Sequence, residues 1–199
     1  MGWVLGLGLV AVAILNLFFV HRVQVSHNAM APTLLAGEEA LVWRRGERDM
    51  GDVVVCQHPG RPGQYVIGRV VGKPGMRVEA PNGQLQIEGT RVDRDIRRDD
   101  VRFYDAVLDR TSTMVYGIEH LGNTDHEFFI RKDDHLRLRP TLVKEGLYVL
   151  ADNRSVRGND SRDFGPVKQA TCIGEVFMRL RPNPDDPNDL GHGWFDWIR

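Results

Sequence analysis

The chain has 199 residues, of which 42% are hydrophobic and 27% are charged, and its formal net charge is −1. This length is sufficient for one well-cored domain, or for a core that carries an inserted subdomain. A near-neutral balance without a basic excess excludes the usual electrostatic profile of a nucleic-acid-binding protein. Two cysteines, Cys56 and Cys172, permit one disulfide or two free thiols, so they leave the cellular compartment open.

The first strong pattern is an apolar run from Gly2 to Val20, in which Asn16 is the only strongly polar side chain. As a helix this run would span about 28 Å, close to the thickness of the hydrocarbon core of a bilayer. We therefore expect residues 1–22 to form a transmembrane anchor that contacts membrane lipid through residues 2–20. A cleaved secretory signal is the alternative, but the run lacks a preceding basic region and a small-residue cleavage site.

Beyond residue 23 the pattern is that of β-structure, without a long amphipathic helix. Short β-branched or alternating runs are bounded by Gly, Pro, Asn and Asp, which is typical of strands. They predict strands at 39–43, 52–56, 65–71, 84–89, 127–131, 146–151 and 171–180. Asn82 and Gly83 predict a hairpin turn, because this pair tolerates the positive φ that a type I′ turn needs. The fold class is therefore predicted to be mainly β.

Changes in composition divide this β region. Residues 23–80 and 141–181 are predicted to form a β core, and the more highly charged residues 81–140 are predicted to form an inserted β subdomain. The tail, residues 182–199, begins as a Pro/Asp-rich linker and ends on the aromatic stretch WFDWIR. Paired tryptophans dock at lipid interfaces or cap a core, and the sequence leaves both roles open for this tail.

Four motifs follow one another along the chain: AMAPTLLAGE, GDVVV, YVIGRVVGKPG and LADNRSVRGNDSRDFGPV. Together with the N-terminal apolar run, they resemble the type I signal peptidases, a family of bacterial membrane-bound serine proteases. The resemblance implies an all-β catalytic core with a β insertion, held by a single-pass anchor on the outer, periplasmic side of the inner membrane. By the positive-inside rule, the single arginine after the apolar run would instead favour a cytoplasmic β domain. The orientation that the resemblance implies takes precedence. The resemblance implies no cofactor.

The resemblance also assigns the motif residues to the scaffold and the groove of the active site. These residues are Met30, Pro32, Thr33, Arg69, Asp152, Asn153, Arg154, Asp160, Ser161 and Arg162. Among them, Asp160 and Arg162 are expected to form a buried ion pair that shapes the loop beside the active site.

The catalytic positions of the family are altered in this chain. In the family, a serine stands immediately before Met-x-Pro-Thr-Leu, and a desolvated lysine before Arg-Val-Val-Gly takes its proton. Here these positions hold Ala29 and Gly68, which carry no reactive atom. His27 replaces the hydroxyl that helps to bind the oxyanion, and Gly158 replaces the serine that orients the lysine, in a loop one residue longer than usual.

Other residues are poor replacements for the missing dyad. Ser26 and Lys73 lie about 10 Å and about 16 Å along the chain from the nucleophile and base positions. A Cys56–His58 pair could act as nucleophile and base on one strand face, but a buried apolar role for Cys56 is the better interpretation. The histidines of the insertion lack tight ligand spacing, so we expect surface histidines there and no metal site.

Two functions follow from this pattern. We favour a non-catalytic, signal-peptidase-like membrane protein that binds an extended segment by β-augmentation or serves as a subunit of a membrane assembly. Its partner would be another membrane protein or an exported protein, and not a nucleic acid. The alternative is a signal peptidase that removes signal peptides from exported proteins, with its dyad engineered away or its nucleophile unrecognised. Four chemical positions change together, which indicates loss of catalysis rather than one engineered substitution.

Overall fold

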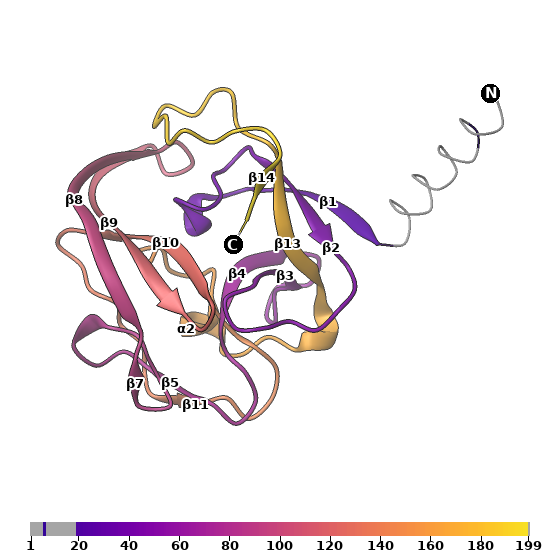
Figure 1. Cartoon of the computed structure of the whole chain (residues 1–199), viewed down its shortest axis with the longest axis vertical. Coiled ribbons are helices and arrows are strands. Elements are labelled where there is room, and N and C mark those ends of the chain that lie inside the picture. The colour runs from indigo at the N-terminus through magenta and orange to yellow at the C-terminus, as the bar shows by residue number, and fades with distance from the viewer. Residues whose placement is uncertain (1–5, 7–18, 199) are drawn as a thin grey trace.

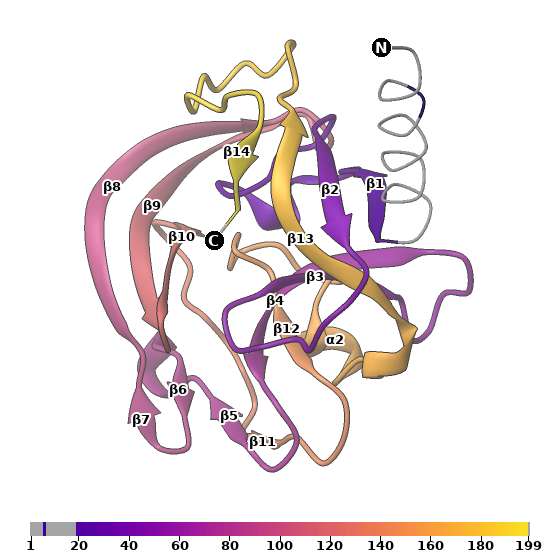
Figure 2. The ribbon, with the colours of Figure 1, turned by 45° about the vertical axis from the view of Figure 1, so that its right-hand side comes forward.

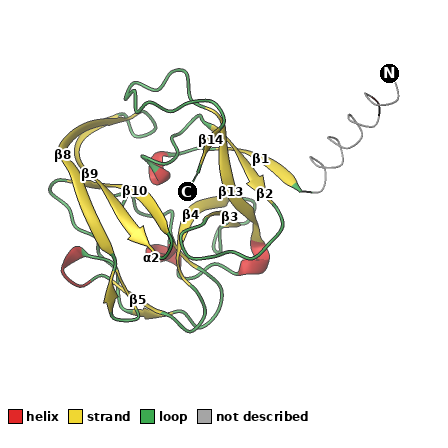
Figure 3. Cartoon of the chain, viewed as in Figure 1, coloured by secondary structure: helices red, strands yellow, loops and turns green. Residues whose placement is uncertain are grey.

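In a computed structural model of the chain, the described residues are 6 and 19–198. These residues form three antiparallel sheets with little helix (Figures 1 and 3). Between residues 19 and 198 the only α-helix is α2 (Ser161–Phe164). The predictions of a mainly β fold and of no long amphipathic helix in the β region are therefore confirmed.

The largest sheet has the strand order β1-β2-β13-β3-β4-β12, and β14 pairs with β13. Its strands are β1 (Val20–Gln24), β2 (Glu39–Trp43), β3 (Val53–Gln57), β4 (Tyr65–Gly72), β12 (Tyr148–Leu150), β13 (Cys172–Arg181) and β14 (Asp196–Trp197). Alternate residues of β3 enter different hydrophobic clusters, because successive side chains of a strand point to opposite faces. Val53 and Val55 belong to one cluster, and Val54 and Cys56 belong to the other.

Two smaller sheets contain the strands between residues 77 and 142. One has the order β10-β9-β8 and consists of β8 (Asp93–Asp105), β9 (Arg110–Leu121) and β10 (Thr124–Arg131). The other has the order β11-β5-β6-β7 and consists of β5 (Arg77–Glu79), β6 (Gln86–Ile87), β7 (Thr90–Arg91) and β11 (Thr141–Leu142). The long strands β8 and β9 curve beside the largest sheet (Figure 2).

The seven predicted strands all overlap observed strands, and the predicted hairpin turn is present. Asn82 and Gly83 both have positive φ, 53° and 76°, and they lie between the paired strands β5 and β6. The prediction gave no strand over any part of β8 or β9. The first eight residues of β8 are exposed, so no apolar alternation marked them in the sequence.

The N-terminal boundary differs from the prediction. The sequence placed the anchor helix through Val20 and the anchor segment through residue 22, but the chain is extended from Val20 onward, where β1 pairs with β2. The rest of the predicted anchor lies outside the described residues. Among the described residues, no helix is long and apolar enough to cross a membrane.

One hydrophobic cluster joins the sheets. Leu121 and Phe128 of the three-stranded sheet lie in the same cluster as Val78 of β5 and Leu150 of β12. Since the sheets share this cluster, the division into a core and an inserted subdomain at residues 81 and 140 stays a prediction.

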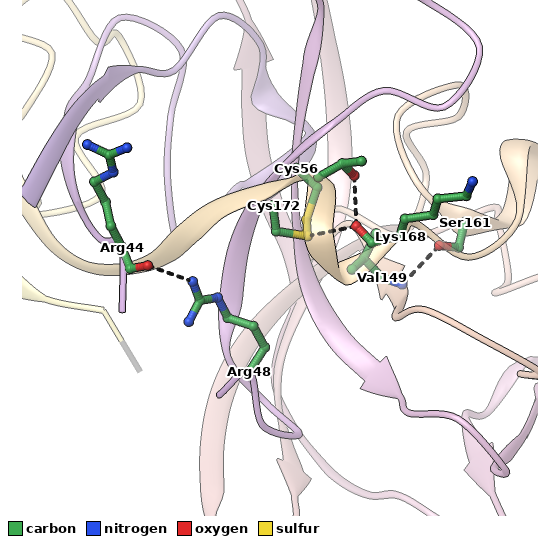
Figure 4. The surroundings of a disulfide bond; sticks show 8 residues. Arg44, Arg48, Cys56, Val149, Ser161, Lys168 and Cys172 are labelled. Carbon is green, nitrogen blue, oxygen red and sulfur yellow. Dashed lines mark hydrogen bonds between the residues drawn. A yellow bond between two sulfur atoms is a disulfide. The ribbon is translucent and has the colours of Figure 1, made fainter. Parts of the chain in front are cut away.

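The two cysteines form a disulfide between neighbouring strands. Cys56 of β3 lies opposite Cys172 of β13, and their sulfur atoms are bonded (Figure 4). This resolves the alternative between a disulfide and two free thiols. It also removes Cys56 as a candidate nucleophile, because a disulfide sulfur is not a thiolate.

Candidate functional site

The motif around Ala29 folds into a short buried turn after β1. The turn is η1 (Asn28–Met30), a 3-10 turn in which all three residues are buried. His27 caps it, and its Nδ1 accepts a hydrogen bond of 3.3 Å from the backbone N–H of Ala29. Burial lowers the pKa of His27 from its ordinary value. The imidazole is therefore neutral near pH 7 and accepts at Nδ1, so the Ala29 amide is already engaged.

Asn153 holds this turn from the opposite side. Its backbone N–H donates to the carbonyl oxygen of Ala29 over 2.9 Å, and its side-chain Nδ2 donates to the carbonyl oxygen of Asn28 over 3.3 Å. The Ala29 peptide is thus fixed on both sides by residues of two motifs that lie far apart in the sequence.

Gly68 lies on β4, which neighbours η1. A Cβ atom added at Gly68 would lie 3.0 Å from Cβ and 3.3 Å from Cγ2 of Val149 on β12. Contacts this short require the neighbour to shift by a few tenths of an ångström. A side chain at position 68 would therefore press on Val149.

A buried ionic network joins Thr33, which follows η1, to Arg69 of β4 and to Asp152, which follows β12. Arg69 donates to both carboxylate oxygens of Asp152, through Nε at 2.9 Å and through a terminal nitrogen at 2.7 Å. The hydroxyl of Thr33 donates to the same carboxylate over 2.5 Å. Burial raises the pKa of Asp152, but the charge and hydrogen bonds of Arg69 outweigh it and hold the pKa below its ordinary value.

The last motif forms a second ion pair. Asp160 and Arg162 are buried, and a guanidinium nitrogen lies 2.7 Å from Asp160 Oδ2, as expected for this pair. Asp160 also accepts a hydrogen bond from the backbone N–H of Ala151, and Ser161 accepts one from that of Val149 (Figure 4). These two side chains satisfy backbone donors of β12 and the residue after it. Gly158 adopts a φ of +84°, and its N–H donates to Asp163.

Two cavities lie beside Ala29. One, of about 340 Å³, is lined by residues 21–24 and 26–27, by Tyr65 and Ile67 of β4, and by apolar residues of β3 and β13. The other, of about 260 Å³, is lined by Ala29 itself, by Asn153 and by the tip of the β8–β9 hairpin. His27 lines both cavities and Ala29 lines the smaller one, and the two cavities together are called the groove beside Ala29.

Comparison with known proteins places the chain in a family. The model of the family described as signal peptidase, peptidase S26, matches residues 1–181. The chain belongs to the signal peptidase family. It is 29% identical to signal peptidase IB of Staphylococcus aureus over 90% of this chain and 88% of that protein. It is 30% identical to signal peptidase I of Bacillus caldolyticus over 86% of this chain and 85% of that protein.

The residues considered as replacements for the family's dyad lie in different places. Ser26 is exposed and lines the larger cavity, whereas Lys73 pairs with Asp49 over 2.8 Å. Neither of the two cavities beside Ala29 is lined by a lysine among the described residues. The structure brings together the motif residues of the signal peptidase family without bringing a lysine to them.

The sequence analysis missed Glu119 and His126, which contact Arg154 of the last motif. Arg154 donates to the carboxylate of Glu119 over 2.5 Å, and His126 Nε2 lies 3.4 Å from the same carboxylate. The prediction of surface histidines in the insertion is wrong for His126, which is only 2% exposed. The sequence could have indicated this burial, because alternation along β10 puts His126 on the same face as the buried Phe128. The described residues contain no cluster of three metal-ligating side chains.

Proposed function

We propose that this chain is a non-catalytic member of the signal peptidase family that binds an extended peptide segment in the groove beside Ala29. One observation carries the loss of catalysis. The positions of the family's nucleophile and base hold Ala29 and Gly68, and a side chain at position 68 would press on Val149. A hydroxyl restored at Ala29 would have no general base, a group that contributes about 10²- to 10⁴-fold to catalysis.

The position of the oxyanion also supports this proposal. Backbone N–H groups are common donors to the oxyanion of acyl transfer. The N–H of Ala29 instead donates to His27 Nδ1. In an active site this amide would have to be free to face the substrate carbonyl, and here a neutral imidazole stands in its path.

Unpaired strand edges support the binding of a peptide. Within the described part of the chain, β1 pairs only with β2, and β4 pairs with β12 only from Arg69 onward. The edges of β1 and of Tyr65–Gly68 therefore remain available, and the cavity of about 340 Å³ lies between them. An extended peptide can add to such edges through main-chain hydrogen bonds, while Ile67 and Ile173 offer apolar contacts to its side chains. By likeness to the relatives, the peptide would come from the signal-peptide region of an exported protein.

We further propose that the apolar segment preceding β1 anchors the chain in the inner membrane of a bacterium, with the β domain on the outer side. The disulfide supports this side, because disulfides persist in oxidising compartments such as the periplasm. A row of aromatic rings supports an adjacent membrane surface, since Phe19, Trp43, Phe177 and Trp197 follow one another with centroid separations of 5.6, 6.5 and 5.8 Å. Alkaline phosphatase fused after Arg199 should be active in cells, and an inactive fusion would contradict this orientation.

The experiment for the function uses the full chain in detergent with a fluorescent preprotein segment. We expect saturable binding by fluorescence anisotropy and no cleavage above background by mass spectrometry. Ala29→Ser should leave cleavage at background. Ser26→Trp, which places a bulky ring in the larger cavity, should weaken binding at least tenfold, whereas Lys144→Trp at an exposed position outside both cavities should not.

Two results would overturn the proposal. Turnover of the preprotein by the unmodified chain, abolished by Ser26→Ala, would place an active nucleophile in the groove. Absence of binding to preprotein segments, or binding that Ser26→Trp leaves unchanged, would show that the groove is not a peptide site.

A further inference from the structure

The two cavities of the groove differ in charge. The charged residues that line the smaller cavity, of about 260 Å³, are Asp105, Arg110, Arg131 and Arg157. Of these, Arg157 is already paired with Asp163 over 3.2 Å. The larger cavity is lined by one arginine, Arg22, which pairs with Glu39 over 2.8 Å, and by no carboxylate. The two ends of the groove therefore offer different partners to a bound peptide.

The carboxylate in the lining of the smaller cavity is bound by the protein itself. Asp105 Oδ1 accepts a hydrogen bond from Asn28 Nδ2 over 2.8 Å. It also accepts from the backbone N–H groups of Val107 and Leu108 over 3.0 and 3.3 Å. Although Arg110 lies opposite Asp105 in the pairing of β8 with β9, the two side chains form no ion pair. Asp105 thus holds the β8–β9 turn against η1 and leaves Arg110 without a paired carboxylate.

The guanidinium groups of Arg110 and Arg131 are available to an anionic ligand. Arg110 has no hydrogen-bond or ion-pair partner among the described residues. Arg131 lies 3.6 Å from a carboxylate oxygen of Asp133 and 3.5 Å from one of Asp134. Its Nε is buried and has no hydrogen-bond acceptor in the described part of the chain. Because a buried donor without an acceptor is costly, this atom points to an acceptor supplied by a ligand.

A free strand edge lies beside these two arginines. β10 pairs with β9 only as far as Arg131 and Met114, so on this side residues 110–112 have no neighbour among the described strands. A cavity of about 450 Å³ lies here and shares Arg110, Ser112 and Arg131 with the smaller cavity of the groove. Its other lining residues are Thr111, Thr113, Lys132 and Asp133. A peptide that extends past the smaller cavity therefore meets a strand edge, hydroxyl groups and guanidinium groups together.

We propose that this end of the groove selects acidic residues, so that the preferred peptide carries aspartate or glutamate where it passes Arg110 and Arg131. The inference rests on the proposed function, because its occupant is the peptide bound in the groove. Guanidinium groups suit this role, since their paired N–H donors match the two oxygens of a carboxylate. The larger cavity offers Ile67 and Ile173 to the other end of the peptide. The groove thus favours a peptide that is apolar at one end and acidic at the other.

The test measures binding of fluorescent preprotein segments to the full chain in nonionic detergent by fluorescence anisotropy. Two series of segments carry Asp-Asp, Asn-Asn or Lys-Lys, one series before and the other after the same apolar stretch. In one series Asp-Asp should bind about three- to tenfold more tightly than Asn-Asn, and Lys-Lys more weakly, because ion pairs near the surface are modest. The other series should not discriminate, since its altered end lies away from the arginines. Salt at about 0.5 M should abolish the preference by screening.

Arginine variants locate the selectivity. Arg110→Gln and Arg131→Gln should each weaken binding of the Asp-Asp segment about threefold and leave the Asn-Asn segment unchanged, and the double variant should show no preference. Arg139→Gln is the matched control, because this exposed arginine lines none of these cavities. A Tm equal to that of the unmodified chain establishes that each variant is folded.

Four results would overturn the inference, and they separate it from the proposed function. Equal binding of Asp-Asp and Asn-Asn segments, still weakened by Ser26→Trp, would leave the peptide groove and refute its acidic selectivity. An Asp-Asp preference that persists in the double arginine variant would place the selecting charge elsewhere. Displacement of the Asp-Asp segment by inorganic phosphate, but not by sodium chloride of equal ionic strength, would identify a small anion as the ligand. Absence of binding by every segment would refute the proposed function as well.

Discussion

Gly68 and Val149 lie on the neighbouring strands β4 and β12 and pack against each other at the position where the resemblance to the family predicts a lysine. A Cβ built at Gly68 would lie 3.0 Å from that of Val149, so a larger residue requires Val149 to shift by a few tenths of an ångström. A lysine placed at position 68 would therefore have to repack this contact as well as supply an amine. This packing is the physical reason to expect that catalysis is not restored by one or two substitutions.

Gly68→Ala should lower the free energy of unfolding by about 1–3 kcal/mol, because it overpacks this contact. Val149→Ala in the same chain should recover part of that loss, giving a favourable coupling in a double-mutant cycle. Urea denaturation measures both. Gly60→Ala is the matched control, since its Cβ would meet only ordinary contacts at 3.8 Å. A Gly68→Ala protein as stable as the Gly60→Ala protein would contradict the packing explanation.

Asp152 is held ionised in the folded protein by Arg69, so its folded pKa lies below its unfolded value of about 3.9. The stability that it contributes is fully present above that value and is lost as the pH falls through the folded pKa. Asp152→Asn should remove this acid dependence below about pH 4. It should also destabilise the protein by about 3–5 kcal/mol at pH 7, because Arg69 stays buried without its carboxylate.

Urea titrations between pH 2 and pH 7 measure this effect. Asp99→Asn, which breaks an exposed pair with Lys132, is the control and should change stability by about 0–1 kcal/mol. Equal losses in the two variants would mean that burial adds nothing to the Asp152–Arg69 pair.

At the scale of elements, the tail connects the largest sheet to the β8–β9 ribbon. Asn188 bonds both backbone groups of Tyr104 with one side chain, in the way a neighbouring strand would. Strand β14 returns the chain to β13, where Met178 faces Trp197. The tail thus adds pairing to two sheets, although it has only one short strand of its own.

Asn188→Ala should lower the unfolding free energy by about 1–3 kcal/mol, because two partly buried backbone groups of β8 lose their partner. Differential scanning calorimetry would record this as a lower Tm. Asp185→Ala, three residues earlier on the exposed side of the tail, is the control. Hydrogen exchange at the Tyr104 amide should also accelerate in the Asn188 variant. Unchanged protection of this amide would contradict the proposed role of Asn188 in holding the tail against β8.

At the scale of the whole molecule, the Cys56–Cys172 disulfide closes a loop that contains the entire insertion. Its two ends are 116 residues apart in the sequence. Cross-linking positions this far apart restricts the unfolded chain strongly in the loop-entropy description. The pair is therefore placed where it stabilises the whole β domain rather than one hairpin.

The variant with both Cys56→Ala and Cys172→Ala should unfold at lower urea concentration, with a loss of about 2–4 kcal/mol. Dithiothreitol should produce a similar loss in the unmodified chain and none in the double variant. If dithiothreitol leaves the unmodified chain unchanged while the double variant is destabilised, the loss comes from the alanine substitutions rather than from the cross-link.

Much of this protein follows from its sequence alone. Alternating apolar residues determined the mainly β class, and β2 has the predicted bounds of 39–43. The Asn82–Gly83 turn follows from local backbone preference. The motif order led to the family and to the buried Asp160–Arg162 pair. These features depend on residues close in the chain, or on motifs that can be read directly.

Tertiary structure decided the rest, because those features join residues that are far apart in the sequence. Nothing in the sequence pairs Cys56 with Cys172 rather than leaving two thiols, or sets Val149 against Gly68. Charged runs hid the long strands of the insertion, and with them the burial of His126 beside Glu119. The cavity of about 580 Å³ between the insertion and the tail needs the tail folded back against the insertion, a placement that only long-range packing could settle.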